Sequence, residues 1–360
     1  VKIILEKHSR IRPRTLSVQN NQHLPAKHPK VSFGKVGVLL VNLGTPDGTD
    51  YKSMRRYLAE FLSDRRVIEW NPLYWYPILY GIVLNKRPQK VGKAYQEIWN
   101  NELNESYLRT YTRNQGELLS KALSDLPNVV VDWGMRYGQP SIASKIDALR
   151  AKGCDKIVLF PLYPQYAAAT TATVNDKAFQ HLMKLRWQPA VRTVPAYYDD
   201  EVYIEALANS IENHLAGLDW KPEKILASYH GIPQSYFDKG DPYYCHCQKT
   251  TRLLRERLGL SGEQLITTFQ SRFGPEEWLQ PYTDKTVESL AKDGVKNIAV
   301  FNPGFVSDCL ETLEEIAGEA GEIFTHNGGE NFTHIPCLND SPDGMKVLEK
   351  VVRRELQGWV

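Results

Sequence analysis

Short apolar runs of β-type residues alternate with helix-like stretches from Val36 onward, and this alternation constrains the fold more than any other feature of the chain. The clearest runs are Val36–Leu43, Val129–Val131, Lys156–Phe160, Lys224–Ser228, Leu265–Phe269 and Asn297–Phe301. Runs that are apolar at nearly every position are typical of parallel strands covered by helices on both faces. We therefore predict an α/β protein built on doubly wound parallel sheets.

The rhythm of the chain predicts two lobes. A length of 360 residues exceeds that of a typical single domain, and the loop at Asp219–Pro222 separates halves of similar pattern. We predict an N-terminal lobe at residues 35–205 and a similar C-terminal lobe at residues 206–360. Residues 1–34 hold seven Lys or Arg against the single acid Glu6, with no apolar segment of signal-peptide length. We interpret them as a flexible basic extension, with a transit peptide as the alternative.

Charge and cysteine usage argue against several classes of protein. A formal net charge of +2 is too balanced for a protein that binds nucleic acid. The five cysteines have no regular spacing, which argues against a disulfide framework and favours a reducing compartment. The adjacent residues Cys245-His246-Cys247 cannot close a tetrahedral zinc site alone, and no second Cys/His pair has zinc spacing.

The stretch at residues 67–84, VIEWNPLYWYPILYGIVL, is nearly all apolar. Glu69, Asn71, Pro72 and Pro77 interrupt it, which argues against a membrane-spanning helix. Its clustered aromatic residues, and the basic residues that follow it, suit a membrane interface. A buried pair of helices explains the same composition, so both interpretations stay open on the residues alone.

Polar and aromatic residues follow nearly every predicted strand. Ligands of open parallel sheets bind in the crevice outside the carboxyl ends of the strands. At these ends lie Asn42-Leu43, Arg136-Tyr137, His230 and Asn302–Phe305. Because such side chains are unusual in generic loops, we expect one shared cleft to collect them.

His230 is the first candidate for proton chemistry. It comes directly after a strand and before Gly231-Ile232-Pro233, a stiff turn that would hold it at the edge of the cleft. An imidazole exchanges protons near neutral pH. The alternative is a structural histidine, which is the commoner role of a lone His.

An acidic run after the last of these strands is the second candidate. Glu311, Glu315, Glu319 and Glu322 recur at three- and four-residue spacing, which would align four carboxylates on one helical face. Oxygen ligands of this kind suit a hydrated divalent cation. Two alternatives stay open: a solvated acidic surface, and a capping box with residues 307–308 as the N-cap.

No P-loop, GxSxG or GxGxxG motif is present, so neither phosphate binding by a glycine-rich loop nor serine hydrolysis has support. Seven other segments stand out: LLVNLGTP at 39–46, MRYGQP at 135–140, LYPQYAAATT at 162–171, SYHGIP at 228–233, KGDPYYCHC at 239–247, TFQSRFGPEEWLQPYTD at 268–284 and PGFVSDCLETLEEI at 303–316. In this order and spacing they resemble the ferrochelatase family over residues 35–355, and proteobacterial members most closely.

The resemblance implies two similar Rossmann-like lobes with the substrate cleft between them. It implies a lyase that inserts Fe²⁺ into protoporphyrin IX, with loss of two pyrrole protons, in the terminal step of haem biosynthesis. The matched positions imply metal and proton chemistry at His230 and Glu311, and an acidic network at Asp308 and Glu315. Porphyrin contacts are implied at Asn42, Leu43, Arg136, Tyr137, Tyr243, Trp278 and Phe305. Residues 67–84 match an apolar lip over the pocket mouth, which favours peripheral membrane contact by a cytoplasmic enzyme.

Two positions depart from patterns seen in relatives. Some members hold a [2Fe–2S] cluster through a cysteine in the YPQY segment and three in a C-terminal extension, whereas residues 167–169 here are AAA and the sequence ends at Val360. We therefore expect no such cluster and no cofactor beyond the substrate Fe²⁺, although other relatives place cluster cysteines elsewhere. Cys309 stands where some relatives have His, which argues against metal relay there, while a thiolate would bind a soft cation.

Two other functions fit parts of the sequence. A chelatase for another tetrapyrrole, such as a cobalt chelatase or a coproporphyrin-specific iron chelatase, would share most of these motifs. A two-lobed haem carrier would be expected to have a secretory signal and no acidic run. The sequence does not specify an oligomeric state.

Overall fold

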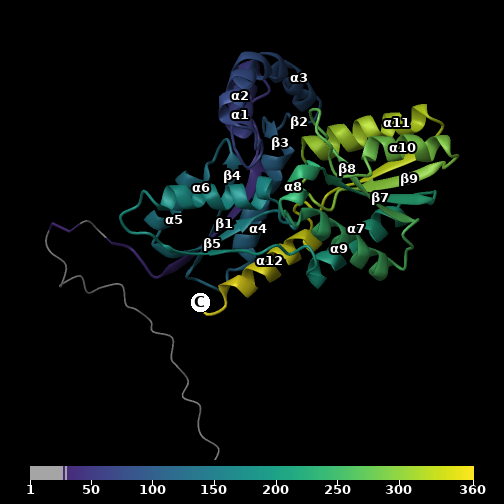
Figure 1. The fold of residues 1–360 in the computed structure, drawn as a ribbon. Coiled ribbons are helices and arrows are strands. Elements are labelled where there is room, and N and C mark those ends of the chain that lie inside the picture. The colour runs from purple at the N-terminus through teal and green to yellow at the C-terminus, as the bar shows by residue number, and fades with distance from the viewer. Residues whose placement is uncertain (1–26, 29–30) are drawn as a thin grey trace, which may run out of the picture.

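The computed structural model describes residues 27–28 and 31–360. Within them the chain forms two parallel four-stranded sheets with helices packed on both faces, as Figure 1 shows. The predicted α/β fold of two similar lobes is confirmed. Residues 1–26 and 29–30 of the predicted basic extension lie outside the described residues.

The first lobe is built on the sheet β4-β1-β5-β6, with all neighbours parallel. Its strands are β1 (Lys35–Gly44), β4 (Val129–Tyr137), β5 (Cys154–Pro161) and β6 (Ala190–Thr193). Its helices are α1 (Tyr51–Leu62), α2 (Pro72–Ile78), η1 (Leu79–Val83), α3 (Leu84–Glu97), α4 (Tyr107–Ala122), α5 (Ile142–Ala151), η2 (Ala168–Ala172) and α6 (Thr173–Leu182). A short ribbon of β2 (Trp99–Asn100) and β3 (Glu105–Ser106) precedes α4.

The second lobe is built on the parallel sheet β10-β9-β7-β8. Its strands are β7 (Lys224–His230), β8 (Leu265–Gln270), β9 (Asn297–Phe301) and β10 (Asn331–Ile335). Its helices are α7 (Glu201–Ala216), α8 (Gln234–Asp238), α9 (Tyr243–Leu258), α10 (Thr283–Lys292), η3 (Glu311–Ala320), α11 (Gly321–His326) and α12 (Pro342–Leu356).

Both sheets have the same topology. When the strands of each lobe are counted in chain order, both sheets read 2-1-3-4 from one edge to the other. The first strands, β1 and β7, therefore occupy equivalent places beside the point where the strand order reverses. Parallel sheets open their ligand crevices at the carboxyl ends of such strands.

One apolar core joins the two lobes. Successive side chains of a strand point to opposite faces, so Leu39 and Val41 of β1 pack in one cluster while Val38 and Leu40 pack in another. The second of these clusters continues through α7 and α12 into the other sheet, where it includes Ala227 of β7. This shared core fixes the two sheets so that their carboxyl ends face one cavity.

The apolar stretch at residues 67–84, which we call the lip, includes α2 and η1 and lies in the projection at the top of Figure 1. Trp75 and Leu79 are buried against α1, whereas Leu73 and Tyr74 are 81% and 73% exposed. The lip thus buries one face and presents the other to its surroundings. No helix in the described part of the chain is long and apolar enough to cross a bilayer.

Candidate active site

A cavity lies between the carboxyl ends of the two sheets and collects residues from both lobes. From the first lobe it takes the end of β1 and the segment that follows β5. From the second it takes the turn after β7 and the segment between β9 and η3. His230 and Glu311, which are far apart in the sequence, both line it.

The other residues implied by the resemblance divide into two groups. Those that also line the cavity are Asn42, Leu43, Tyr243, Trp278 and Phe305. Those that are not among its lining residues are Arg136, Tyr137, Asp308 and Glu315. The second group lies behind the cavity wall, where these side chains hydrogen-bond to other parts of the protein.

His230 is the last residue of β7 and pairs with Gln270 of β8. Its Nδ1 lies 2.6 Å from the backbone oxygen of Gly231. A carbonyl oxygen only accepts, so Nδ1 carries the hydrogen in the neutral ring and Nε2 keeps a free lone pair. Glycine at residue 231 keeps this turn close to β8, because an added Cβ would lie 3.0 Å from the backbone oxygen of Gln270 and 3.2 Å from the Trp278 ring, tighter than most such contacts.

Glu311 begins η3, a π-helix, and the residue before it makes no side-chain cap. In the described structure neither Ser307 nor Asp308 accepts a hydrogen bond from a backbone N–H in the first turn of η3, so the capping-box alternative is wrong. The carboxylate of Asp308 is buried and instead accepts hydrogen bonds from Thr312 Oγ1 at 2.9 Å and Asn339 Nδ2 at 2.7 Å. Asp308 thus fixes the turn that leads into η3. Farther along, Glu319 is exposed, as a solvated acidic surface requires.

Gln270 is a central residue to which the sequence analysis assigned no role. Its buried amide oxygen accepts hydrogen bonds from Ser228 Oγ at 2.7 Å and Asn302 Nδ2 at 2.8 Å. Its amide nitrogen donates to the backbone oxygen of Glu311 at 2.8 Å and to Glu315 Oε2 at 3.4 Å. One side chain therefore ties the ends of three strands to the first turn of η3.

Glu315 lies directly behind Glu311 on η3. Its carboxylate accepts hydrogen bonds from Ser271 and Gln270. Burial raises the pKa of Glu315 above its ordinary value, and the charge of Glu311 adds to this, while the hydrogen bond from Ser271 and the nearby His230 oppose it. A carboxyl group in this environment holds a proton at a higher pH than an exposed Glu does.

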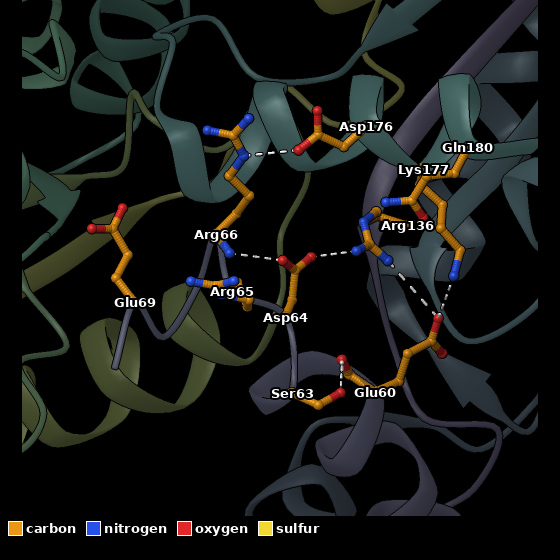
Figure 2. Close-up of a pocket in the computed structure, with 10 residues that line it drawn as sticks. All are labelled: Glu60, Ser63, Asp64, Arg65, Arg66, Glu69, Arg136, Asp176, Lys177 and Gln180. Carbon is orange, nitrogen blue, oxygen red and sulfur yellow. Dashed lines mark hydrogen bonds and ion pairs between the residues drawn. The ribbon is translucent and has the colours of Figure 1, made fainter. Parts of the chain in front are cut away.

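Arg136 and Tyr137 both hydrogen-bond to Asp64. Figure 2 shows the Arg136 side chain directed toward Asp64. The guanidinium forms an ion pair with Asp64, and its Nε donates to Thr173 Oγ1 at 2.6 Å. Burial alone would raise the pKa of Asp64, but hydrogen bonds from Thr173 and the backbone of Arg66, with the charge of Arg136, hold it below its ordinary value.

Cysteines contribute little ligand capacity near the cavity. Cys309 lines it beside Glu311, but burial and the charge of Glu311 raise the pKa of the thiol well above its ordinary value, so the thiol stays protonated. Cys245 is exposed on α9, whereas Cys247 is buried. Across residues 27–28 and 31–360, no group of three or more His, Cys, Asp or Glu is placed to hold a metal ion.

Known proteins of one family are similar to this chain over most of its length. The family model for ferrochelatase matches residues 35–356. A ferrochelatase of Agrobacterium fabrum is 81% identical over 94% of this chain and 98% of its own length. A ferrochelatase of Rhizobium johnstonii is 79% identical over 93% and 98%, and one of Brucella ovis is 71% identical over 92% and 95%.

Solved structures show the same fold at low identity. SirB from Bacillus subtilis with Fe³⁺ has a TM-score of 0.54 and 14% identity, and covers 91% of this chain and 97% of its own. The family evidence does not come from this fold likeness but from the sequence matches, which give no support to a haem carrier or a chelatase for another tetrapyrrole. The chain therefore belongs to the ferrochelatase family, and it is a metal-chelating lyase that inserts Fe²⁺ into protoporphyrin IX in haem synthesis.

Proposed function

We propose that the cavity between the two lobes is where this enzyme inserts iron, with His230 and Glu311 as its catalytic residues. The observation that carries the proposal is that both residues line one cavity although they come from separate strand ends. Metallation requires two pyrrole N–H protons to leave while a cation enters. A neutral imidazole and a carboxylate are groups that accept protons and bind Fe²⁺.

In this proposal His230 Nε2 accepts a pyrrole proton, because Nδ1 is already engaged by the turn carbonyl. Glu311 offers carboxylate oxygens for Fe²⁺ or for the released proton. Glu315 serves as the next proton acceptor, since its pKa is raised and responds to both His230 and Glu311. Asp308 does not exchange protons; its hydrogen bonds hold the start of η3 in place.

The lining of the cavity suits a flat, largely apolar macrocycle. Aromatic and aliphatic side chains dominate it, and Tyr163 Oη and Gln165 Oε1 lie buried there with no hydrogen-bond partner in the described part of the chain. Buried polar atoms of this kind are normally satisfied, so a bound ligand or water is expected to reach them. The enclosed volume is about 200 Å³. Sites for small-molecule ligands usually measure about 300–1,000 Å³, so we propose that the walls part to admit porphyrin.

The porphyrin contacts implied at Asn42, Leu43, Tyr243, Trp278 and Phe305 are part of the proposal. Interactions with the ring periphery would hold the macrocycle in a saddled shape that turns the nitrogen lone pairs toward the metal. We assign Arg136 and Tyr137 to support of the cavity wall, since Tyr137 packs on Phe61 with ring centroids 5.0 Å apart and Phe61 lines the cavity.

We further propose that catalysis needs no [2Fe–2S] cluster. Residues 168–172 form the π-helix η2 and contain only Ala and Thr, so that segment offers no thiolate. A chelator-treated preparation without the visible absorption of a cluster should turn over normally. Loss of activity together with cluster iron would contradict this part of the proposal.

We also propose that this is a cytoplasmic enzyme that touches a membrane peripherally through the lip. Leu73, Tyr74 and Ile82 are all more than half exposed on it. An apolar and aromatic face of this kind is suited to the boundary between headgroups and acyl chains.

The His230→Ala variant tests the catalytic proposal most directly. We expect insertion of Fe²⁺ into protoporphyrin, followed anaerobically by visible absorption, to fall by about 10²–10⁴-fold, as is typical for loss of a general base. Porphyrin binding, followed by quenching of protein fluorescence, should change little. His326→Ala, at an exposed histidine in α11, is the matched control. Normal turnover by His230→Ala would remove this residue from the mechanism.

A further inference from the structure

A second pocket, of about 640 Å³, is lined by residues from the end of α1, the segment that follows it, β4 and α6 (Figure 2). It shares no lining residue with the cavity that holds His230. Its lining residues, all of which are charged or polar, are Glu60, Ser63, Asp64, Arg65, Arg66, Glu69, Arg136, Asp176, Lys177 and Gln180. We call it the polar pocket.

Arg136 reaches this pocket with unused hydrogen-bonding capacity. The residue is only 9% exposed, and its Nε and Nη2 are engaged by Thr173 and Asp64. Its Nη1 is buried and has no hydrogen-bond partner among the described residues. A buried charged donor without an acceptor is costly, so an unmet acceptor position next to Nη1 is a specific feature of this structure.

Lys177 points to the same place. Its Nζ and Arg136 Nη1 each lie 3.9 Å from one oxygen of Glu60, Oε1, which is too far for a hydrogen bond. The other oxygen of Glu60 is held by the backbone N–H of Gly138 at 3.0 Å. Two cationic donors therefore converge on a point that the protein's own carboxylate reaches only at long range.

The charges of the polar pocket favour an anion. Its four acids and four bases balance formally, but five of these eight charges are neutralised in close ion pairs. The pairs are Arg66 with Asp176, Arg136 with Asp64, and Glu69 with Lys239, which lies outside the lining. Arg65 and Lys177 then remain against Glu60 alone. The excess is positive, and a cation would be repelled by the two donors that converge there.

We propose that the polar pocket binds a small multivalent oxyanion, with Arg136 Nη1 and Lys177 Nζ as its donors and Glu60 displaced. Planar guanidinium and ammonium groups are the usual partners of phosphate and carboxylate oxygens. The volume admits an organic polycarboxylate as well as inorganic phosphate. This site lies beyond the iron-insertion proposal and does not depend on it.

The polar pocket is connected to the cavity that holds His230 through a short series of side-chain contacts. Asp64, which pairs with Arg136, accepts a hydrogen bond from Tyr137 Oη at 2.9 Å, and Tyr137 packs on Phe61 of the cavity lining. An anion held by Arg136 would therefore lie next to the Asp64 and Tyr137 side chains, which support the cavity wall at Phe61.

Calorimetric titration of the full-length protein with inorganic phosphate, and separately with citrate, tests the proposal. Ionic strength is held constant with chloride, so that general screening does not contribute. We expect saturable binding. Lys177→Gln should weaken it by about tenfold, because it removes a charged donor. Glu60→Gln should strengthen it by roughly fivefold, because it removes the competing charge while an amide oxygen still accepts from Gly138.

The opposite signs of these two effects make the test specific. Both side chains are more than a third exposed, so neither substitution should prevent folding, and circular dichroism checks this. Lys184→Gln, at an exposed lysine just after α6, is the matched control and should leave affinity unchanged. Tighter binding of phosphate or of citrate identifies which source of oxyanion the pocket prefers. Absence of saturable binding by both probes, or equal affinities in all three variants, would overturn the proposal.

Discussion

The two lobes share a topology but contribute different chemistry to the cavity. The first-lobe residues that line it are apolar, aromatic or uncharged polar residues, and none is Asp, Glu, His, Lys or Arg. His230 and Glu311 both come from the second lobe. Two sheets with the same 2-1-3-4 strand order therefore differ in what their carboxyl ends supply: an uncharged wall in the first lobe, and proton-exchanging groups in the second. The fold places strand ends, and the side chains at those ends decide what each lobe does.

Charged residues at the edge of the first sheet do not line the cavity and pair mainly with one another. Arg136 and Asp64 form a nearly buried pair with side-chain exposures of 9% and 11%. In the second lobe, Gln270 and Glu315 instead stand directly behind the cavity residue Glu311. We therefore expect substitutions in the first lobe to change stability or binding, and those in the second lobe to change turnover.

The largest effect is expected for Asp64→Asn. Removing one partner of a buried ion pair leaves Arg136 without its closest counter-charge and typically costs about 3–5 kcal/mol of unfolding free energy. Urea denaturation at neutral pH measures this loss. At temperatures where the variant stays folded, kcat should remain near that of the parent enzyme. A large fall in kcat with an unchanged unfolding free energy would contradict the expectation that substitutions in the first lobe change stability and not turnover.

This difference in stability should depend on pH. The pKa of Asp64 is lowered in the folded state, so its stabilising contribution is fully present above the unfolded pKa of about 3.9 and is lost as pH falls through the folded value. The gap in unfolding free energy between the parent and Asp64→Asn should therefore narrow below about pH 4. Asp176→Asn, at an exposed pair with Arg66, is the control and should show a much smaller gap.

Glu311→Gln is expected to have the next largest effect, in the second lobe. Loss of the carboxylate charge should lower kcat for iron insertion by about 10²-fold, the lower end of the range for acid–base residues. Stability and porphyrin affinity should change little, because the amide has almost the same shape. Glu319→Gln, at an exposed position on the same helix, provides the comparison. Equal activities of these two variants would exclude a special role for Glu311.

Gln270→Ala should have a smaller effect on turnover, because Gln270 positions Glu311 and Glu315 and does not itself line the cavity. It removes the donor to the Glu311 carbonyl, and we expect kcat to fall by about tenfold while KM for porphyrin stays constant. It also removes a hydrogen bond that lowers the pKa of Glu315. The limb of the pH–rate profile that reports this group should then move to higher pH. An unmoved profile would indicate a purely structural role; Gln264→Ala, outside this network, is the control.

Much of the fold could be predicted because buried parallel strands are apolar throughout. The strand predicted at Asn297–Phe301 is observed with those bounds. The strand predicted at Lys224–Ser228 is observed as Lys224–His230, two residues longer at its carboxyl end. The strands β6, AVRT, and β10, NFTHI, were not predicted. Both are sheet edges, where one side lacks a partner strand and more polar residues are tolerated.

Candidate site residues could be predicted from the sequence only where they directly follow an apolar strand. His230 follows an apolar run directly, so its position at a crevice could be inferred. The role of Gln270 depends on contacts with Glu311 and Asn302, which are distant in the sequence, and no local pattern encodes them. The prediction that four carboxylates share one helical face assumed the 3.6-residue period of an α-helix. Residues Glu311–Ala320 instead form a π-helix, which has a different period and so changes which carboxylates share a face.

The smallest expected effect concerns the lip, which is the feature that most clearly distinguishes the first lobe from the second. Leu73→Ser should weaken co-sedimentation with anionic lipid vesicles by roughly fivefold, since partial burial of one Leu contributes about 1 kcal/mol. Iron insertion in detergent-free solution should not change. Met183→Ser is a close control, because Met183 is 80% exposed and Leu73 81% exposed, but Met183 lies at the end of α6, away from the lip. If both variants weaken vesicle binding equally, exposed apolar area alone explains it. If only Leu73→Ser does, the first lobe supplies the membrane contact as well as the cavity wall, and the second lobe keeps the proton chemistry.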